Sequence, residues 1–149
     1  MPLRHFEDFA IGQKLRLRPH TVTRAEIIAF AAEFDPQPFH LDEAAAAEPL
    51  LGRLCASNWH TCALFMRMLY DSWLRDTASM GSPGVDSLKW LRPVRPGDKL
   101  SGRAVVLDTR ASKSRPDRGF VRFRHEVENA DGEPVMVLEN PIMFARRTG

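Results

Sequence analysis

Two residues whose side chains can exchange protons, Asp35 and His40, stand five positions apart in a segment that also contains two prolines. Pro36 and Pro38 each fix one φ angle and hold the residue before them out of the helical conformation. We therefore expect residues 35–42 to form a stiff, extended loop that keeps the carboxylate and the imidazole in a fixed relation. A rigid loop that carries such a pair is suited to general acid–base catalysis.

The segment before this loop predicts an amphipathic helix. Thr23 and Glu26 have the spacing of a capping box. Apolar residues then recur at helical intervals: Ile27, Phe30, Ala31 and Phe34. Pro36 stops the helix, which places Asp35 at its carboxyl end. Because helix carbonyl groups point toward that end and disfavour a carboxylate, we expect the pKa of Asp35 to be raised.

Two more helices are predicted after the loop. Asp42 is placed to cap a short alanine-rich helix that Pro49 ends. A longer helix is expected from about Ser57, its candidate N-cap, to Leu74. Apolar residues surround it on nearly all sides, so we expect it to be buried on most sides at the centre of the fold.

The rest of the chain predicts β-structure. We expect strands over four stretches: Ser87–Trp90, Leu100–Asp108, Val121–Glu128 and Val135–Arg146. Residues 95–98 contain the Pro-Gly pair of a type II turn, and Asp131-Gly132 is a hairpin signal. Asn140-Pro141 is expected to interrupt the last strand at a bulge or an edge. With an extended stretch within residues 1–22, these segments predict an α+β fold, an antiparallel sheet wrapped around one long helix.

Composition bounds the class of protein. The 149 residues suffice for a single domain, residues 1–149, with its own core, and the net charge of +2 gives no argument for nucleic acid or an anionic membrane. The apolar segments are too short for a membrane span and the first residues do not resemble a signal peptide, so we expect a cytoplasmic protein. Cys55 and Cys62 lack a CxxC spacing, which predicts two buried, unpaired thiols.

The segment Phe30–Asp42 contains an Asp, two residues, a Pro, one residue, a His, a hydrophobic residue and an acid. This pattern resembles the hydratase motif of the MaoC-like dehydratases. Further similarity lies in Cys55–His60, Gly81–Asp86 and Leu91–Asp98, so the resemblance extends over nearly the whole chain. It implies a hotdog fold and the reversible addition of water to a trans-2-enoyl thioester, commonly an acyl-CoA, to give the (R)-3-hydroxyacyl form.

The resemblance also implies roles for individual residues. The family's Asp and His hold one water between them, which implies that Asp35 and His40 are catalytic. The thioester oxygen needs a preorganised donor, which the family supplies as the backbone N–H of a glycine where this chain has Asn58. We expect further substrate contacts from four residues: Gln37, Ser57, Trp59 and His60. No metal or cofactor is expected.

Two departures from the family pattern bear on specificity. Gln37 stands where many members have Asn, and Met66 stands where bacterial (R)-hydratases have Ser. A metal site at Asp35, His40 and His60 is a weaker interpretation of the same residues. A nucleophilic triad with Ser57 is weaker too, because the chain has no nucleophile-elbow motif.

The basic segment 110–118 has two interpretations. It is either a solvated loop or a contact for the phosphates of CoA through Lys113, Arg115 and Arg118. It lacks the interleaved aromatic residues that nucleic-acid binding would favour. On the expected apolar strand face, His125 is interpreted as a hydrogen-bonded core histidine.

A homodimer is expected, because pairing two subunits edge to edge covers the open edges of a single sheet. The resemblance implies the same, with the acyl pocket near the subunit boundary. The carrier of the acyl group is left open between CoA and acyl carrier protein. Two alternative functions are a hotdog thioesterase and a non-catalytic acyl-CoA-binding subunit in which the changed helix start has abolished the chemistry.

Overall fold

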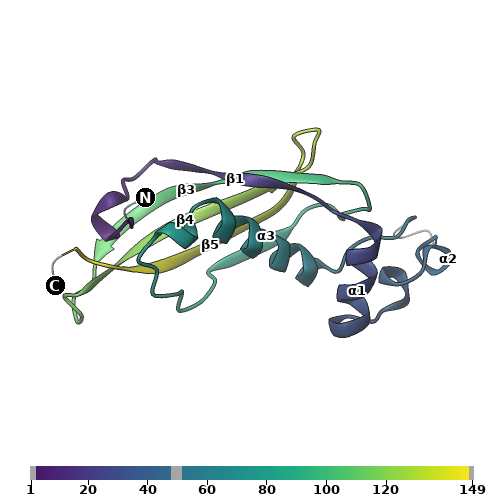
Figure 1. The fold of residues 1–149 in the computed structure, drawn as a ribbon, viewed down its shortest axis with the longest axis horizontal. Helices are drawn as coiled ribbons and strands as arrows, with labels where there is room; N and C mark the ends of the chain where they lie inside the picture. The colour runs from purple at the N-terminus through teal and green to yellow at the C-terminus, as the bar shows by residue number, and fades with distance from the viewer. Residues whose placement is uncertain (1–2, 48–51, 148–149) are drawn as a thin grey trace.

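The computed structural model describes residues 3–47 and 52–147 (Figure 1). One antiparallel sheet of five strands has the order β1-β3-β4-β5-β2. The strands are β1 (Lys14–Thr21), β2 (Ser87–Trp90), β3 (Lys99–Ala111), β4 (Arg118–Glu128) and β5 (Pro134–Ala145). The α-helices are α1 (Arg24–Phe34), α2 (Glu43–Ala46) and α3 (Asn58–Ser72). Three 3-10 turns cover Phe6–Asp8, Pro38–His40 and Leu74–Asp76.

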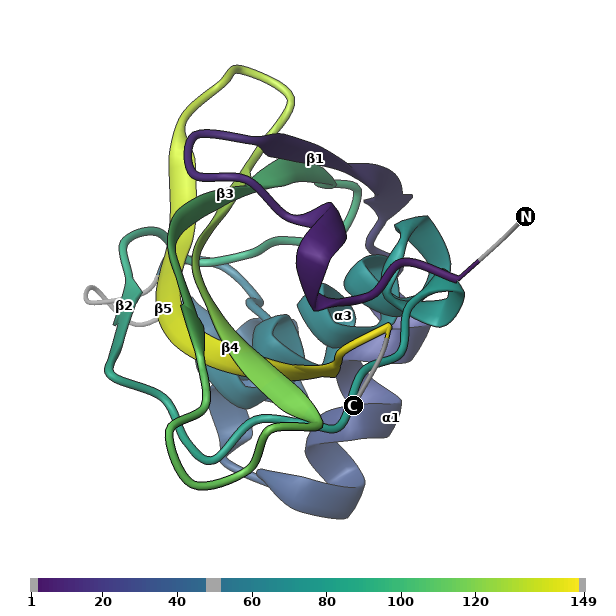
Figure 2. The same ribbon diagram turned by 90° about the vertical axis from the view of Figure 1, so that its left-hand side faces the viewer.

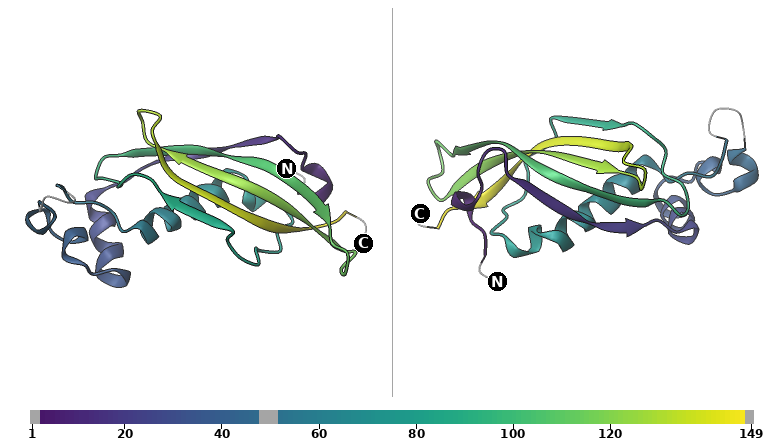
Figure 3. Two further views of the ribbon diagram at one scale, coloured as in Figure 1. Left: turned by 180° about the vertical axis from the view of Figure 1, so that it is seen from behind. Right: turned by 90° about the horizontal axis from the view of Figure 1, so that it is seen from above.

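The sheet curves around α3, which lies along its inner face (Figure 2). Helices α1 and α2 lie beyond one end of the sheet, while the β3–β4 connection and the C-terminal end lie at the other (Figures 1 and 3). This arrangement confirms the predicted α+β fold with one long helix wrapped by an antiparallel sheet. It also gives the molecule two distinct ends, which matters for the site below.

Alternation along β4 builds the centre of the core. Val121, Phe123, His125 and Val127 are all buried, as their spacing predicted. Phe123 packs edge to face against Phe9 with ring centroids 5.8 Å apart. The hairpin expected at Asp131-Gly132 joins β4 to β5, and Gly132 takes the positive φ of 78° that such a turn requires.

The predicted interruption at Asn140-Pro141 is not found in β5. Around this dipeptide the strand pairs with β4 without a break, with Pro141 opposite Arg122, and the register shift of the pairing lies elsewhere, between Val127 and Glu128. Proline is tolerated here because β2 pairs with β5 only as far as Glu139, so Pro141 lies past the end of that neighbour, at a local edge.

Helix α3 is less buried in the single chain than its composition predicts. Its buried residues are His60, Thr61, Phe65, Met68 and Leu69. On another side, Trp59, Met66 and Tyr70 remain 60%, 47% and 46% exposed. The expectation of burial on most sides is therefore wrong for one chain, because a single sheet covers only one face of a helix.

Both predicted caps of the shorter helices are present. Thr23 accepts the Glu26 N–H at 3.2 Å, and Asp42 accepts the Ala44 N–H at 3.3 Å. The predicted helix end at Pro49 lies outside the described residues. Phe34, expected on the apolar face of α1, is exposed.

The loop after α1 differs from the extended form predicted for it. Pro38–His40 is a 3-10 turn, because a proline with φ near −65° suits the first position of a helical turn. Gln37, before it, is extended as the following proline requires. The turn shortens the distance between Asp35 and His40.

Candidate active site

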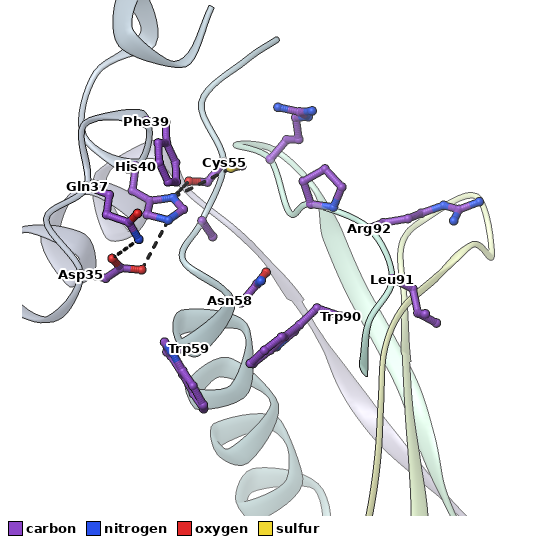
Figure 4. A pocket seen from close by; sticks show the side chains of 13 residues that line it. Asp35, Gln37, Phe39, His40, Cys55, Asn58, Trp59, Trp90, Leu91 and Arg92 are labelled. Carbon is purple, nitrogen blue, oxygen red and sulfur yellow. Dashed lines mark hydrogen bonds and ion pairs between the residues drawn. The ribbon is translucent and has the colours of Figure 1, made fainter. Parts of the chain in front are cut away.

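A cavity of about 530 Å³ opens where three segments meet: the loop after α1, the start of α3 and the residues after β2 (Figure 4). This volume is in the range of small-molecule sites. Its lining includes Asp35, His40, Asn58, Trp59, Trp90 and Arg92. The two residues predicted to do acid–base chemistry therefore face a common cavity.

His40 and Asp35 form a close pair at the wall of this cavity. The His40 Nε2 atom lies 3.4 Å from the Asp35 Oδ2 atom, and the two side chains are 8% and 17% exposed. On the other side of the ring, Nδ1 lies 2.8 Å from the Cys55 carbonyl oxygen. Because a carbonyl can only accept, Nδ1 carries a proton, which leaves Nε2 as the atom that faces the carboxylate.

Asp35 is held by two further donors. The Ser57 hydroxyl donates to Oδ2 at 2.7 Å, and the Gln37 amide donates to Oδ1 at 2.7 Å. These bonds, with the nearby His40, hold the pKa of Asp35 below its usual value. The raised pKa expected from the helix end is wrong, because hydrogen bonds aimed at the charged form outweigh the carbonyl groups of α1.

Ser57 links Asp35 to the start of α3. Its hydroxyl accepts the Trp59 N–H at 3.3 Å, which confirms it as the N-cap of α3, while the same hydroxyl donates to Asp35. The residue is fully buried and is absent from the cavity lining. Its direct neighbour is the carboxylate, and this contact between residues 22 positions apart could not be read from local spacing.

Asn58 is the first residue of α3 and lies in the cavity. Its side chain extends into the space between Trp90 and the Asp35–His40 pair, called the dyad below (Figure 4). Within residues 3–47 and 52–147, no hydrogen bond is recorded for its side chain. Its backbone N–H is one of the free donors that every helix N-terminus presents, a place that favours a developing negative charge.

The other predicted contact residues divide into two groups. Trp59 and Gln37 line the cavity, where Trp59 meets Trp90 edge to face with centroids 5.0 Å apart. His60 is buried behind the cavity, stacked on Phe30 at 4.6 Å, and is absent from the lining. Burial lowers the pKa of His60.

Comparison with known proteins identifies the family. The MaoC like domain model matches residues 7–129. The chain belongs to the MaoC-like domain family. A MaoC-like dehydratase from Rhodospirillum rubrum is 43% identical, with a TM-score of 0.89 over 97% of this chain and 99% of that one. The hotdog fold is the fold of this family and of this chain.

Two other solved structures are similar to this chain over most of their length. The R-hydratase PhaJ1 from Pseudomonas aeruginosa is 27% identical, with a TM-score of 0.75 over 94% of this chain and 84% of that one. The HadBC complex from Mycobacterium tuberculosis, a 3R-hydroxyacyl-ACP dehydratase, is 25% identical, with a TM-score of 0.71 over 89% and 96%.

Two groups of basic residues bear on the predicted phosphate contacts. Lys113, Arg115 and Arg118 follow β3, whose 13 residues span roughly 40 Å at about 3.3 Å per residue. Because β3 begins beside the end of β1, from which α1 follows, these three lie at the end of the sheet opposite the cavity (Figures 1 and 3). Within one chain they do not line it.

Two arginines that sequence reasoning missed do line the cavity. Arg92 pairs with Glu133 at 3.0 Å, and Arg95 donates to the Arg53 carbonyl oxygen at 2.8 Å. Both belong to Leu91–Asp98, a segment quoted for the family resemblance, but nothing in its spacing indicates which of its cations line the cavity. No helix in the described ranges is long and apolar enough to cross a membrane.

Proposed function

We propose that this MaoC-like protein is a hydratase/dehydratase that adds water reversibly to a trans-2-enoyl thioester to give a 3-hydroxyacyl thioester. The observation that carries the proposal is the Asp35–His40 pair, which faces one cavity together with the N-terminus of α3. The names of two relatives support it, since one is an R-hydratase and the other a 3R-hydroxyacyl-ACP dehydratase.

The chemistry needs a base, an acid and a site for negative charge. A water held between Asp35 and His40 loses a proton to the dyad as its oxygen bonds to the β-carbon. The π electrons of the double bond then move toward the thioester oxygen, which becomes enolate-like. A proton returns from the dyad to the α-carbon, so the net change is the addition of one water.

The enolate-like oxygen is assigned to the backbone N–H of Asn58. A helix N-terminus presents this donor without reorganisation, and such preorganised donors are commonly worth 10²–10³-fold or more in rate. Replacement of the family's glycine by Asn keeps the N–H. The carboxamide adds a second donor in the cavity beside it.

We expect the bound acyl carrier to extend out of the cavity past arginines at the cavity rim. Arg92 and Arg95 are placed to meet a phosphate of CoA or of the phosphopantetheine arm of acyl carrier protein. The apolar Trp59 and Trp90 suit the acyl part. His60 and Ser57 support this cavity from behind instead of touching the substrate.

We further propose a homodimer. The exposed apolar side of α3, formed by Trp59, Met66 and Tyr70, and the short edge strand β2 both favour burial against a second copy. Antiparallel pairing of β2 with its copy would turn the second sheet end for end. That pairing would bring the partner's β3–β4 loop to the cavity end, where Lys113, Arg115 and Arg118 could reach a CoA phosphate.

Two other functions remain testable alternatives. A thioesterase would release free CoA, and an accessory subunit would bind acyl-CoA without turnover. The discriminating experiment incubates the protein with crotonyl-CoA and with longer and branched enoyl-CoAs, and follows the conjugated enoyl absorbance and the release of free thiol in parallel. Loss of the enoyl absorbance without thiol release supports the hydratase. Binding without either signal rejects it in favour of the accessory role.

A further inference from the structure

Both oxygens of the Asp35 carboxylate are occupied by hydrogen-bond donors. Gln37 donates its amide N–H to Oδ1, and Ser57 donates its hydroxyl to Oδ2, each at 2.7 Å. Both donors are neutral, and a bond of this kind stabilises the ionised form of a carboxyl group. The Ser57 hydroxyl is buried and its own acceptor role is filled by the Trp59 N–H.

His40 has the opposite arrangement. One ring nitrogen, Nδ1, is committed to the Cys55 carbonyl oxygen at 2.8 Å. The other, Nε2, lies 3.4 Å from Asp35 Oδ2, beyond ordinary hydrogen-bond distance. It can therefore gain and lose a proton without breaking a protein contact. Proton exchange at Nδ1 would break the bond to Cys55.

We propose that Asp35 remains a carboxylate through the whole reaction cycle and that His40 Nε2 alone carries the proton, with Ser57 and Gln37 as the positioning residues that enforce this division. The inference rests on the proposed hydratase function and refines it. It replaces a dyad that shares the proton with one in which the carboxylate orients the water and stabilises the imidazolium.

The steps balance with one proton carrier. Neutral His40 takes a proton from water at Nε2 while the water oxygen bonds to the β-carbon and the π pair moves to the thioester oxygen. The imidazolium then gives that proton to the α-carbon as the enolate pair returns to form the C–H bond. His40 ends neutral and Asp35 has not changed its charge.

The charges around Asp35 are few. Of the groups that act on it, His40 alone can be charged, since Ser57 and Gln37 are neutral. Arg92 and Arg95 line the same cavity, but Arg92 is paired with Glu133 and neither arginine is among the groups that shift the pKa of Asp35. A change of charge at Gln37 is therefore the most direct way to disturb the state of Asp35.

The first experiment compares Gln37→Glu with the wild type in kcat/KM against pH. Two carboxyl groups at this distance share a proton, so the variant should bind a proton in the working range. If Asp35 must be ionised, the acid limb of the profile moves up by about one pH unit or more, with recovery at high pH. If Asp35 acts as a proton donor, activity extends to higher pH instead, which overturns the proposal.

A matched control is the other glutamine of the chain. Gln13→Glu adds the same charge just before β1, where Gln13 Oε1 accepts the Ala10 N–H, and should leave the profile unchanged. Gln37→Met removes the donor without adding charge. It should lower kcat more than it changes KM and shift the acid limb less than Gln37→Glu does.

The second experiment does not depend on activity. NMR of protein with ¹³C-labelled aspartate and ¹⁵N-labelled histidine follows the Asp35 carboxyl group and the His40 tautomer in the free protein. The pKa of Asp35 should lie below that of an ordinary aspartate, Ser57→Ala should raise it, and Ser57→Thr, which keeps the hydroxyl, should restore it. A protonated Asp35 at neutral pH, or a proton on Nε2 of neutral His40, overturns the proposal.

The two experiments separate this inference from the proposed function. If no enoyl thioester is hydrated while the NMR result holds, the hydratase proposal fails and the role of His40 as proton carrier fails with it. If hydration is measured and Asp35 titrates in the working range, the hydratase proposal stands and the division of roles fails.

Discussion

Two buried histidines in different regions of the molecule, His40 at the cavity and His125 in the core, show how surroundings separate a candidate catalytic group from a structural one. In each ring, one nitrogen is hydrogen-bonded to an oxygen. His40 Nδ1 lies 2.8 Å from the Cys55 carbonyl oxygen, and His125 Nε2 lies 3.0 Å from the Asn140 side-chain oxygen. The remaining nitrogen of His40 faces a carboxylate and a cavity. The remaining nitrogen of His125 is buried without a partner among the described residues.

The difference teaches that burial alone does not mark the site. Burial lowers the pKa of His125 to about 4, so this ring is neutral at physiological pH and has no path to solvent. His40 has a charge partner and a space beside it. Changes at the two positions should therefore separate activity from stability.

The largest effect is expected at His40. The substitution His40→Ala removes the imidazole that we propose exchanges a proton with water in the cavity, so kcat should fall by about 10²–10⁴-fold. The enoyl absorbance assay measures the rate, with His5→Ala as the control, because His5 is a partly exposed histidine near the N-terminus, at the opposite end of the sheet from the cavity. An unchanged rate in His40→Ala would show that the dyad is not catalytic.

Much of this site could be predicted because its signals are local. Asp35, His40 and the prolines between them lie within one short segment, and Gln37 is part of it. The alternating residues of β4 and the caps at Thr23, Asp42 and Ser57 are local as well. Sequence reasoning therefore found the dyad and most of the elements that hold it.

The remaining features depend on tertiary packing. The bond from Ser57 to Asp35 joins the residue before α3 to the residue after α1, and it reverses the direction of the pKa shift that the helix end alone suggests. The place of Arg92 in the cavity lining depends on the tertiary packing of the segment after β2. The exposed side of α3 follows from the number of sheets available to cover it, which composition does not state.

The second largest effect is expected on stability at His125. Its folded-state pKa of about 4 lies below the ordinary value of 6.5, so the unfolded chain binds a proton that the folded protein refuses. The free energy of unfolding is therefore unaffected by protonation of this histidine above pH 6.5. As the pH falls from 6.5 toward 4, the free energy of unfolding decreases by about 3 kcal/mol in total. Urea unfolding at pH 7 and pH 4.5 measures it.

The control for this prediction is a side chain that does not titrate. His125→Gln can still bond Asn140, and its free energy of unfolding should lose about 2 kcal/mol less than the wild type between those two pH values. Its kcat at pH 7 should stay within a few-fold of the wild type. Equal pH dependence in the two proteins would contradict the assignment.

A smaller effect on kcat is expected at Asn58. Its side chain lies beside the dyad yet makes no hydrogen bond within the described residues. Asn58→Gly keeps the backbone N–H and removes the carboxamide, so kcat should change by less than about tenfold, in contrast to His40→Ala. Branched and longer enoyl-CoAs should gain relative to crotonyl-CoA as the cavity widens. A loss of about 10²-fold or more would instead make the carboxamide a principal oxyanion donor.

The smallest effect in a single chain is expected at the far end of the sheet. Lys113 and Arg115 lie roughly 40 Å along β3 from the cavity end, beyond the screening length of about 10 Å at 0.1 M salt. In a monomer, Lys113→Ala with Arg115→Ala should therefore change KM for acyl-CoA by less than about twofold, while Arg92→Ala should raise it several-fold. In the proposed homodimer, the loop variant should raise KM as well. A large KM increase in the loop variant, together with a dimer in sedimentation, would show that the partner's loop reaches across. The phosphate contact would then belong to the assembly, and the separation of the two ends would hold only within one chain.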